Sequence, residues 1–230
     1  MDKKNIISYC LFAFLFATPF LFLGLKQINP KNLVKDEFVD VLQDGMRAFI
    51  EPYGGWIIEN GQLILPVKSE RGNRNNIWLR KEYVNFILEL DFKFDAGTNS
   101  GVFIRTANIA DPVQTGIEIQ IRDDYGKSPI DKNFCGSVYD IREVSENRVR
   151  KPGEWNQLKV MAEGTTLLVF LNEGKVIDID LTDWKEAGKN PDGSENKFKT
   201  AYKEMIQPGR LGFQDHGGKV WFRNIRIKEL

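Results

Sequence analysis

Residues 86–94 read FILELDFKF, and this stretch indicates the fold more clearly than any other part of the sequence. Glu89, Asp91 and Lys93 stand at every second position, with hydrophobic residues between them. Such alternation is typical of a β-strand with one buried and one solvated face. We therefore predict a strand here. The residues predicted to face a core are Leu88, Leu90, Phe92 and Phe94.

Similar strand signals recur along the chain from residue 56 onward. Three hairpins are predicted where glycine-containing turns separate two alternating segments. Their turns are Asn60-Gly61, Glu163-Gly164 and Asp215-His216-Gly217-Gly218. Further strands are predicted over residues 101–105, 116–122 and 176–181. The polar segment 182–207 interrupts this pattern, and only its residues 197–205 carry a weak helical signal.

The spacing of these strands predicts the fold class. Short strands separated by roughly ten residues are typical of an all-β, antiparallel two-sheet sandwich or jelly roll. No internal repeat or linker interrupts the series, so residues 37–230 are predicted to form one domain after a tether at 26–36. The residues predicted to share its core are Leu88, Leu90, Phe92, Ile104, Ile117, Ile119, Ile121, Leu158, Val160, Val169, Leu211, Phe213 and Phe222.

The N-terminus has the two parts of an export signal. Lys3 and Lys4 precede an uncharged, hydrophobic stretch over residues 6–25. The stretch is predicted to form a helix that makes no contact with the sandwich. Twenty apolar residues also suffice to span a bilayer, so cleavage and membrane anchoring through residues 6–25 both stay open. In either case we expect export to the periplasmic or extracellular face of the cell envelope.

Charge and cysteine content exclude several classes of function. The chain has 32 Lys and Arg against 32 Asp and Glu, and this balance argues against a nucleic-acid partner, which would require a basic surface. Without the leader, Cys135 is the remaining cysteine, and an inert buried thiol is the expected role. No metal-ligand spacing is present, and Asp123-Asp124 is expected to be a turn rather than part of a calcium site.

Strand alternation also predicts which side chains lie on non-core faces. If the strands concerned are neighbours in one sheet, their polar groups form a floor and their aromatic groups a wall, which suits a sugar. The same polar face has an ordinary explanation, because any antiparallel sheet exposes one side to water. His216 likewise has the alternative of an exposed turn residue. The residues singled out are Phe103, Arg105, Glu118, Gln120, Gln214, Trp221 and Arg223, with His216 in a turn.

Several motifs together resemble the 3-keto-disaccharide hydrolase domain family, over about residues 35–230. They lie at residues 99–105, 116–121, 151–156, 187–193 and, most specifically, 209–230. The sequence departs from the family pattern at residues 41–45 and at Glu173. The resemblance implies a concanavalin-like jelly roll, and it implies an enzyme, exported by carbohydrate-scavenging bacteria, that cleaves glycosides bearing a ketone at C3. By motif match it places in the pocket Arg105, Glu118, Gln120, Gln214, His216 and Arg223.

The implied chemistry assigns a role to each of these groups. A C3 ketone acidifies the C2 proton, so a base can form an enolate, the C1 oxygen can leave, and water can add back. Glu118 or His216 would be the base and the other the proton donor. Arg105 and Arg223 would stabilise the enolate. The carbohydrate substrate would be bound by Gln120, Gln214, Trp221 and Phe103.

Two other functions remain open from the sequence. The first is a non-catalytic, lectin-like carbohydrate-binding module, since this fold serves both purposes. The second is an anchored structural protein with an inactive site. An enzyme should bring Glu118, His216 and an arginine together in a concave site, whereas a lectin should present a shallow platform led by Trp221 or Phe103. The sequence names no cofactor.

Overall fold

The computed structural model describes residues 37–66 and 75–230. The predicted export helix at 6–25 and the tether at 26–36 lie outside these residues. Within the part that is described, no helix is both long enough and apolar enough to cross a membrane.

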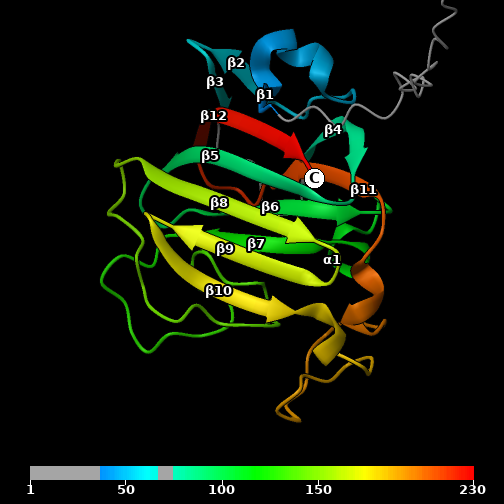
Figure 1. Cartoon of the computed structure of the whole chain (residues 1–230). Helices are drawn as coiled ribbons and strands as arrows, with labels where there is room; N and C mark the ends of the chain where they lie inside the picture. Colours follow the sequence, from blue (N-terminus) through cyan, green and yellow to red (C-terminus); the bar gives the residue numbers. More distant parts are fainter. Residues whose placement is uncertain (1–36, 67–74) are drawn as a thin grey trace, which may run out of the picture. The chain divides into compact units, whose positions relative to one another are not determined.

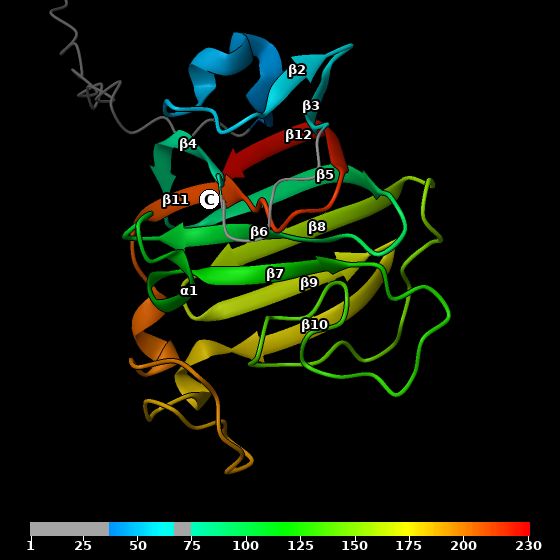
Figure 2. The same cartoon turned by 180° about the vertical axis from the view of Figure 1, so that it is seen from behind.

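Two antiparallel sheets face each other, as predicted from the strand pattern (Figures 1 and 2). The larger sheet contains, in spatial order, β10 (Gly174–Asp180), β9 (Thr166–Leu171), β8 (Asn156–Glu163), β5 (Phe86–Phe94), β12 (Val220–Glu229), β3 (Gln62–Leu65) and β2 (Ile57–Glu59), with β1 (Val39–Asp40) also paired to β12. The smaller sheet contains β4 (Ile77–Tyr83), β11 (Gly209–Phe213), β6 (Asn99–Thr106) and β7 (Ile117–Arg122). The all-β two-sheet sandwich is therefore confirmed.

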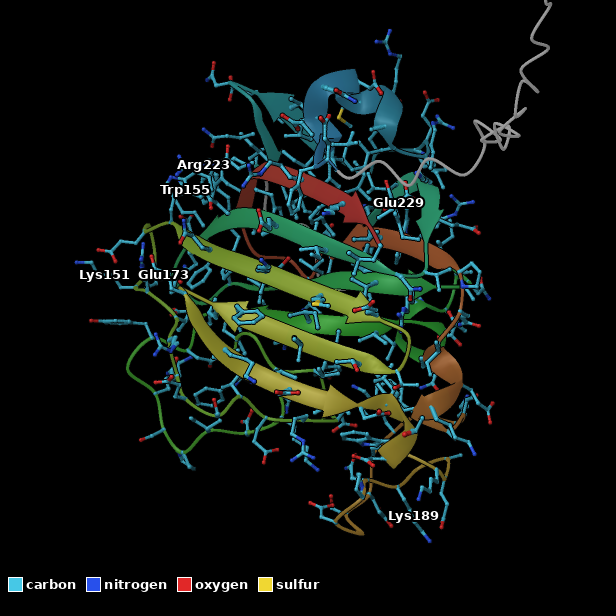
Figure 3. All side chains as sticks on the ribbon, in the orientation of Figure 1. Lys151, Trp155, Glu173, Lys189, Arg223 and Glu229 are labelled. Atoms are coloured by element: carbon cyan, nitrogen blue, oxygen red, sulfur yellow. The ribbon has the colours of Figure 1, made fainter. Side chains whose placement is uncertain are left out.

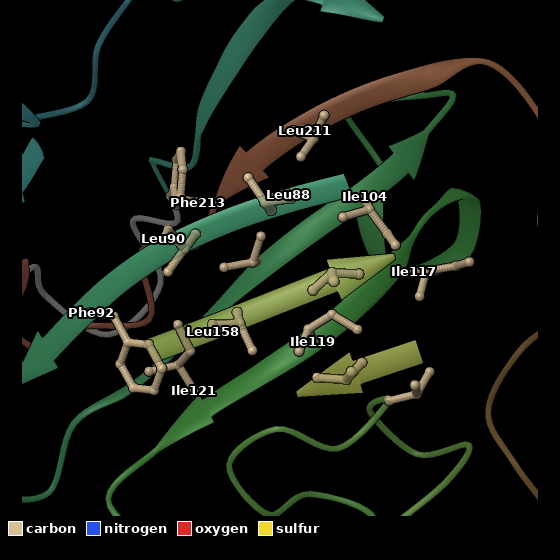
Figure 4. Packing of buried hydrophobic residues seen from close by; sticks show 14 of the residues in the cluster. Leu88, Leu90, Phe92, Ile104, Ile117, Ile119, Ile121, Leu158, Leu211 and Phe213 are labelled. Carbon is tan, nitrogen blue, oxygen red and sulfur yellow. The ribbon is translucent and has the colours of Figure 1, made fainter. Parts of the chain in front are cut away.

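The core between the sheets consists of the side chains predicted from alternation. Every residue of the predicted core is buried, and all of them belong to one cluster (Figure 4). Phe213 of β11 and Phe222 of β12 meet across the two sheets, with ring centroids 4.6 Å apart. Full burial of each such side chain contributes about 1.5–3 kcal/mol, so this layer accounts for much of the stability of the fold.

Within residues 37–66 and 75–230 the helices are short and lie between strands. They are α1 (Pro112–Thr115) and the 3₁₀ helices η2 (Val41–Ala48), η3 (Leu181–Asp183) and η4 (Tyr202–Met205). The helical prediction for residues 197–205 is therefore wrong for its first part. The backbone N–H of Lys197 donates to Asp140 Oδ2 and that of Lys199 to Gln114 Oε1, so these donors are used by side chains instead of helical carbonyls.

The last two strands do not form the predicted closing hairpin. β11 pairs with β4 and β6, whereas β12 pairs with β3, β5 and β1. Residues 214–219 therefore cross from one sheet to the other. A glycine-rich turn fits a hairpin and a crossover equally well, so the turn signal alone did not distinguish them. As a consequence, the outward side chains of β11 and β12 lie on opposite faces of the sandwich.

Candidate functional site

A pocket of about 400 Å³ lies on the outer face of the smaller sheet, the side that carries β6 and β7 in Figure 2. β6, β7 and β11 provide its floor, while α1 and the segments around residues 139, 197 and 216 provide its walls. The lining residues are Asn76, Asn99, Phe103, Ile109, Ala110, Asp111, Pro112, Val113, Gln114, Glu118, Gln120, Tyr139, Lys197, Gln214 and His216.

Glu118 and Gln120 project from β7 into this pocket, as predicted. Ile117, Ile119 and Ile121 of the same strand are buried in the core, so alternation turns the two polar side chains outward. Glu118 is nevertheless only 5% exposed, because the pocket walls cover it. Its Oε1 accepts a hydrogen bond of 2.8 Å from Gln214 Nε2, which ties the carboxylate of β7 to the end of β11.

Two outward-facing glycines, Gly101 and Gly212, leave the space that the side chains of Glu118 and Trp78 occupy. A Cβ atom at Gly101 of β6 would lie 2.5 Å from Glu118 Oε1. A Cβ atom at Gly212 of β11 would lie 2.3 Å from the Trp78 ring. Without these atoms, Trp78 packs across the sheet against Phe103, with ring centroids 5.5 Å apart. Phe103 therefore forms an apolar part of the pocket floor beside the carboxylate.

Tyr139 and Lys197 form one wall of the pocket. The backbone N–H of Tyr139 donates to the Glu118 carbonyl (3.0 Å), so residues 136–139 continue the sheet beyond β7. The Lys197 ammonium lies 3.6 Å from the centroid of the Tyr139 ring, a cation–π contact. Gln114 of α1 holds this segment from the other side, because its Nε2 donates to the Lys197 carbonyl at 3.1 Å.

His216 lies exposed at the rim of the same pocket, on the crossover between the sheets. Hydrogen bonds from backbone N–H groups to side-chain oxygens fix the conformation of this crossover. The Asp215 N–H donates to Asn76 Oδ1 and the Gly217 N–H donates to Asp215 Oδ1, each at 3.0 Å. Glu118 and His216, predicted from the sequence as the acid–base pair, therefore do line one pocket.

Three buried amide oxygens in this pocket have no hydrogen-bond partner among the residues described: Asn99 Oδ1, Gln120 Oε1 and Gln214 Oε1. A buried acceptor without a donor costs about 1–3 kcal/mol. Hydroxyl groups of a bound ligand can supply the missing donors. The pocket is therefore suited to a ligand with several hydroxyl groups.

Arg105 does not lie in the pocket, contrary to the sequence-based prediction. Ile104 and Arg105 of β6 together oppose the single residue Leu211 of β11, because the register shifts at that point. Arg105 has a positive φ of 50° in this bulge, so simple alternation fails there. Its side chain is buried toward the end of the larger sheet, where Nε donates to the Val84 carbonyl (2.7 Å) and Nη1 to the Gly164 carbonyl (3.0 Å). Loss of hydration lowers the pKa of Arg105 to about 10.

Trp221 and Arg223 also lie away from the pocket, because β12 belongs to the larger sheet. Both point outward as predicted, but from the opposite face of the sandwich. Arg223 Nε donates to Asp91 Oδ2 at 3.0 Å, and its guanidinium lies 3.9 Å from the Trp155 ring centroid. Figure 3 shows Arg223 and Trp155 together at the end of the larger sheet. The condition on which the prediction depended, that all four strands share one sheet, is not met.

Burial also shifts the pKa values of Cys135 and Tyr202. Burial raises the pKa of the Cys135 thiol to about 12, as expected of an inert structural cysteine. Burial also raises the pKa of Tyr202 well above its usual value, and the negative charge of Glu118 adds to this effect. Among the described residues, no three His, Cys, Asp or Glu side chains are grouped so as to hold a metal ion.

Sequence reasoning missed several pocket residues, for different reasons. Asn99 stands at the start of a predicted strand motif, and its position there was the signal that could have identified it. Gln114, Tyr139 and Lys197 come from loops and a short helix, where no alternation indicates direction. Asn76 precedes β4, a strand that was not predicted.

One concave site on this β-sandwich brings together a carboxylate, an imidazole and unpaired amide oxygens, a combination that suits a polyhydroxylated ligand. Residues 43–228 match the model of the 3-keto-alpha-glucoside-1,2-lyase-like domain family, so the chain belongs to that family. The resemblance inferred from the motifs is thereby confirmed.

Individual relatives agree with this assignment. The chain is 25% identical over 203 residues to the 3-keto-disaccharide hydrolase of Bacteroides thetaiotaomicron, covering 76% of this chain and 70% of that protein. A solved structure of a candidate glycosyl hydrolase from Parabacteroides distasonis has a TM-score of 0.75 at 32% identity, covering 84% of this chain and 100% of that one. A second from the same organism has a TM-score of 0.61 at 27% identity, covering 77% and 85%. The chain is therefore a hydrolase of the glycoside-acting type.

Proposed function

We propose that this hydrolase cleaves the glycosidic bond of 3-keto-glycosides, including 3-keto-disaccharides, by proton abstraction, elimination and hydration. The observation that carries the proposal is the Glu118 carboxylate, which Gln214 holds in a pocket with three amide oxygens that have no hydrogen-bond donor among the described residues. The relative from Bacteroides thetaiotaomicron, a 3-keto-disaccharide hydrolase, supports the substrate class. The uncharged stretch at residues 6–25 supports export as part of the same proposal.

Glu118 is the proposed base that removes the C2 proton. It is the buried carboxylate of the pocket floor, and its hydrogen bond from Gln214 holds it in position there. His216 is the proposed proton donor to the departing C1 oxygen. Its place at the exposed rim suits a leaving group that must exit toward solvent.

Lys197 takes the role first assigned to the two arginines. Among the described residues that line the pocket, Lys197 is the one Lys or Arg residue. Arg105 donates to the Val84 carbonyl and Arg223 pairs with Asp91, both away from the pocket. A positive charge near the C3 oxygen stabilises the developing enolate. The Tyr139 ring holds the ammonium in place without neutralising its charge.

A comparison of matched substrates tests the proposal. The full chain is incubated with a panel of 3-keto-glycosides and with their unoxidised parents, and release of the aglycone is followed over time. We expect turnover of the keto compounds alone, because the C2 proton of the parent is not acidic. Equal turnover of parent and keto substrate would contradict the proposal, and tight binding without turnover of either would favour the carbohydrate-binding alternative.

A further inference from the structure

The outer face of the larger sheet carries a row of alternating lysine and tryptophan side chains that the proposed reaction does not use. Trp221 of β12 stands directly opposite Lys93 of β5, and Trp155 immediately precedes β8, the next strand. The Lys93 ammonium lies 4.5 Å from the Trp221 ring centroid and 5.0 Å from that of Trp155. The Lys219 ammonium also lies over the Trp221 ring, 4.7 Å from its centroid. We call Lys219, Trp221, Lys93 and Trp155 the lysine–tryptophan row.

No ion pair engages the lysines of this row, Lys93 and Lys219, in the part of the chain that the structure describes. Asp91, which lies two register pairs away on the same face, accepts hydrogen bonds from Arg223 Nε (3.0 Å) and Asn224 Nδ2 (2.8 Å). Indole rings hold the ammonium groups in position by cation–π attraction but leave their charge intact.

We propose that the lysine–tryptophan row binds an acidic saccharide, one that carries carboxylate or sulfate groups. The two ammonium groups pair with the anionic substituents of the sugar, and the half-buried indoles hold these ammonium groups in position. This site lies on the sheet opposite the catalytic pocket, so it can hold a chain or a cell-wall polymer while the pocket stays open. The inference stands independently of the proposed reaction.

The surroundings of the row favour a saccharide over an anionic membrane. The same outer face contains a groove of about 640 Å³ whose lining includes the carboxylates of Asp40, Glu89, Asp91 and Glu173. A flat anionic bilayer pressed against this face would meet those carboxylates, and like charges repel within a Debye length of about 8 Å at physiological salt. A single saccharide chain is narrow enough to lie along the row without covering that groove.

Binding of the full chain to immobilised polysaccharides tests the proposal. The probes are polygalacturonate for carboxylates, dextran sulfate for sulfates, and uncharged dextran. We expect binding to one or both acidic polymers, weakening as salt is raised, and none to dextran. Lys93→Gln/Lys219→Gln should weaken this binding about tenfold. Lys93→Arg/Lys219→Arg should retain it, because arginine preserves both the charge and the cation–π contact.

A matched variant controls for net charge. Lys175→Gln/Lys189→Gln removes the same charge from two exposed side chains outside the row and should bind the acidic polymers like the wild type. Equal weakening by the two glutamine pairs would overturn the proposal, as would unchanged saccharide binding by Lys93→Gln/Lys219→Gln. Binding to phosphatidylglycerol vesicles is measured in parallel. If Lys93→Gln/Lys219→Gln lost binding to the vesicles but not to the polysaccharides, the proposal would also be overturned. Turnover of glycosides by the row variants should stay unchanged, so failure of the proposed reaction is recognised separately.

Discussion

Replacing Glu118 with glutamine is expected to lower kcat by at least about 100-fold, the usual cost of removing a general base. Glutamine has the same shape as glutamate, and its side-chain oxygen can still accept the hydrogen bond from Gln214 Nε2. The fold should therefore stay intact while the base is lost. Because the interaction is needed mainly in the transition state, KM should change far less than kcat. Steady-state aglycone release from a 3-keto-glycoside measures both.

The choice of aglycone tests whether Glu118 is the base and His216 the proton donor. A nitrophenol leaves without needing a proton, so it should restore much of the activity of His216→Ala but none of that of Glu118→Gln. Glu186→Gln, which changes a surface carboxylate outside the pocket, should behave as the wild type. Full activity of Glu118→Gln would remove Glu118 from the mechanism, and equal rescue of both variants would contradict the assignment of base and acid.

Arg105→Met is expected to destabilise the fold by about 2–5 kcal/mol instead of abolishing the chemistry. The substitution leaves the part-buried carbonyls of Val84 and Gly164 without their guanidinium donors. Each buried acceptor that loses its partner costs about 1–3 kcal/mol. Urea-induced unfolding gives the loss of stability, and kcat per folded molecule should stay close to that of the wild type.

Two further variants make this expectation specific to the buried arginine. Arg226→Met removes an exposed guanidinium that pairs with Glu89, and exposed pairs contribute about 0–1 kcal/mol. Arg105→Lys should fall between the two, because an ammonium cannot reproduce both bonds of the guanidinium fork. An Arg105→Met protein as stable as the wild type but inactive would return Arg105 to the catalytic site.

Regular alternation explains why so much of the fold was predictable. The isoleucines of β7 face the core and Glu118 faces the pocket because nothing in residues 117–122 disturbs the period of two. The hairpin turn at Asn60-Gly61 likewise forms as expected, with both residues at positive φ. Wherever local geometry alone decides the direction of a side chain, the sequence was sufficient.

The misplaced residues depended on interactions that are not local. Arg105 departs from alternation because β11 imposes a bulge on β6, a property of the pairing between two strands. Arg223 lies on the far face because β12 crosses to the other sheet, where it pairs with strands distant in sequence. Lys197 reaches the pocket through a loop held by Gln114 and Asp140. None of these partners can be recognised from the neighbouring residues alone.

The position of hydrogen at C2 tests the central claim most directly. A 3-keto-glycoside is cleaved in D₂O, and the released 3-keto sugar is examined by NMR at early times, with the same sugar incubated without enzyme to measure spontaneous exchange. Proton abstraction by Glu118, followed by elimination and hydration, predicts a deuterium at C2 of the product. A product that keeps its original C2 hydrogen, together with equal cleavage rates for substrates that carry hydrogen or deuterium at C2, would show direct hydrolysis at C1 and would contradict the mechanism.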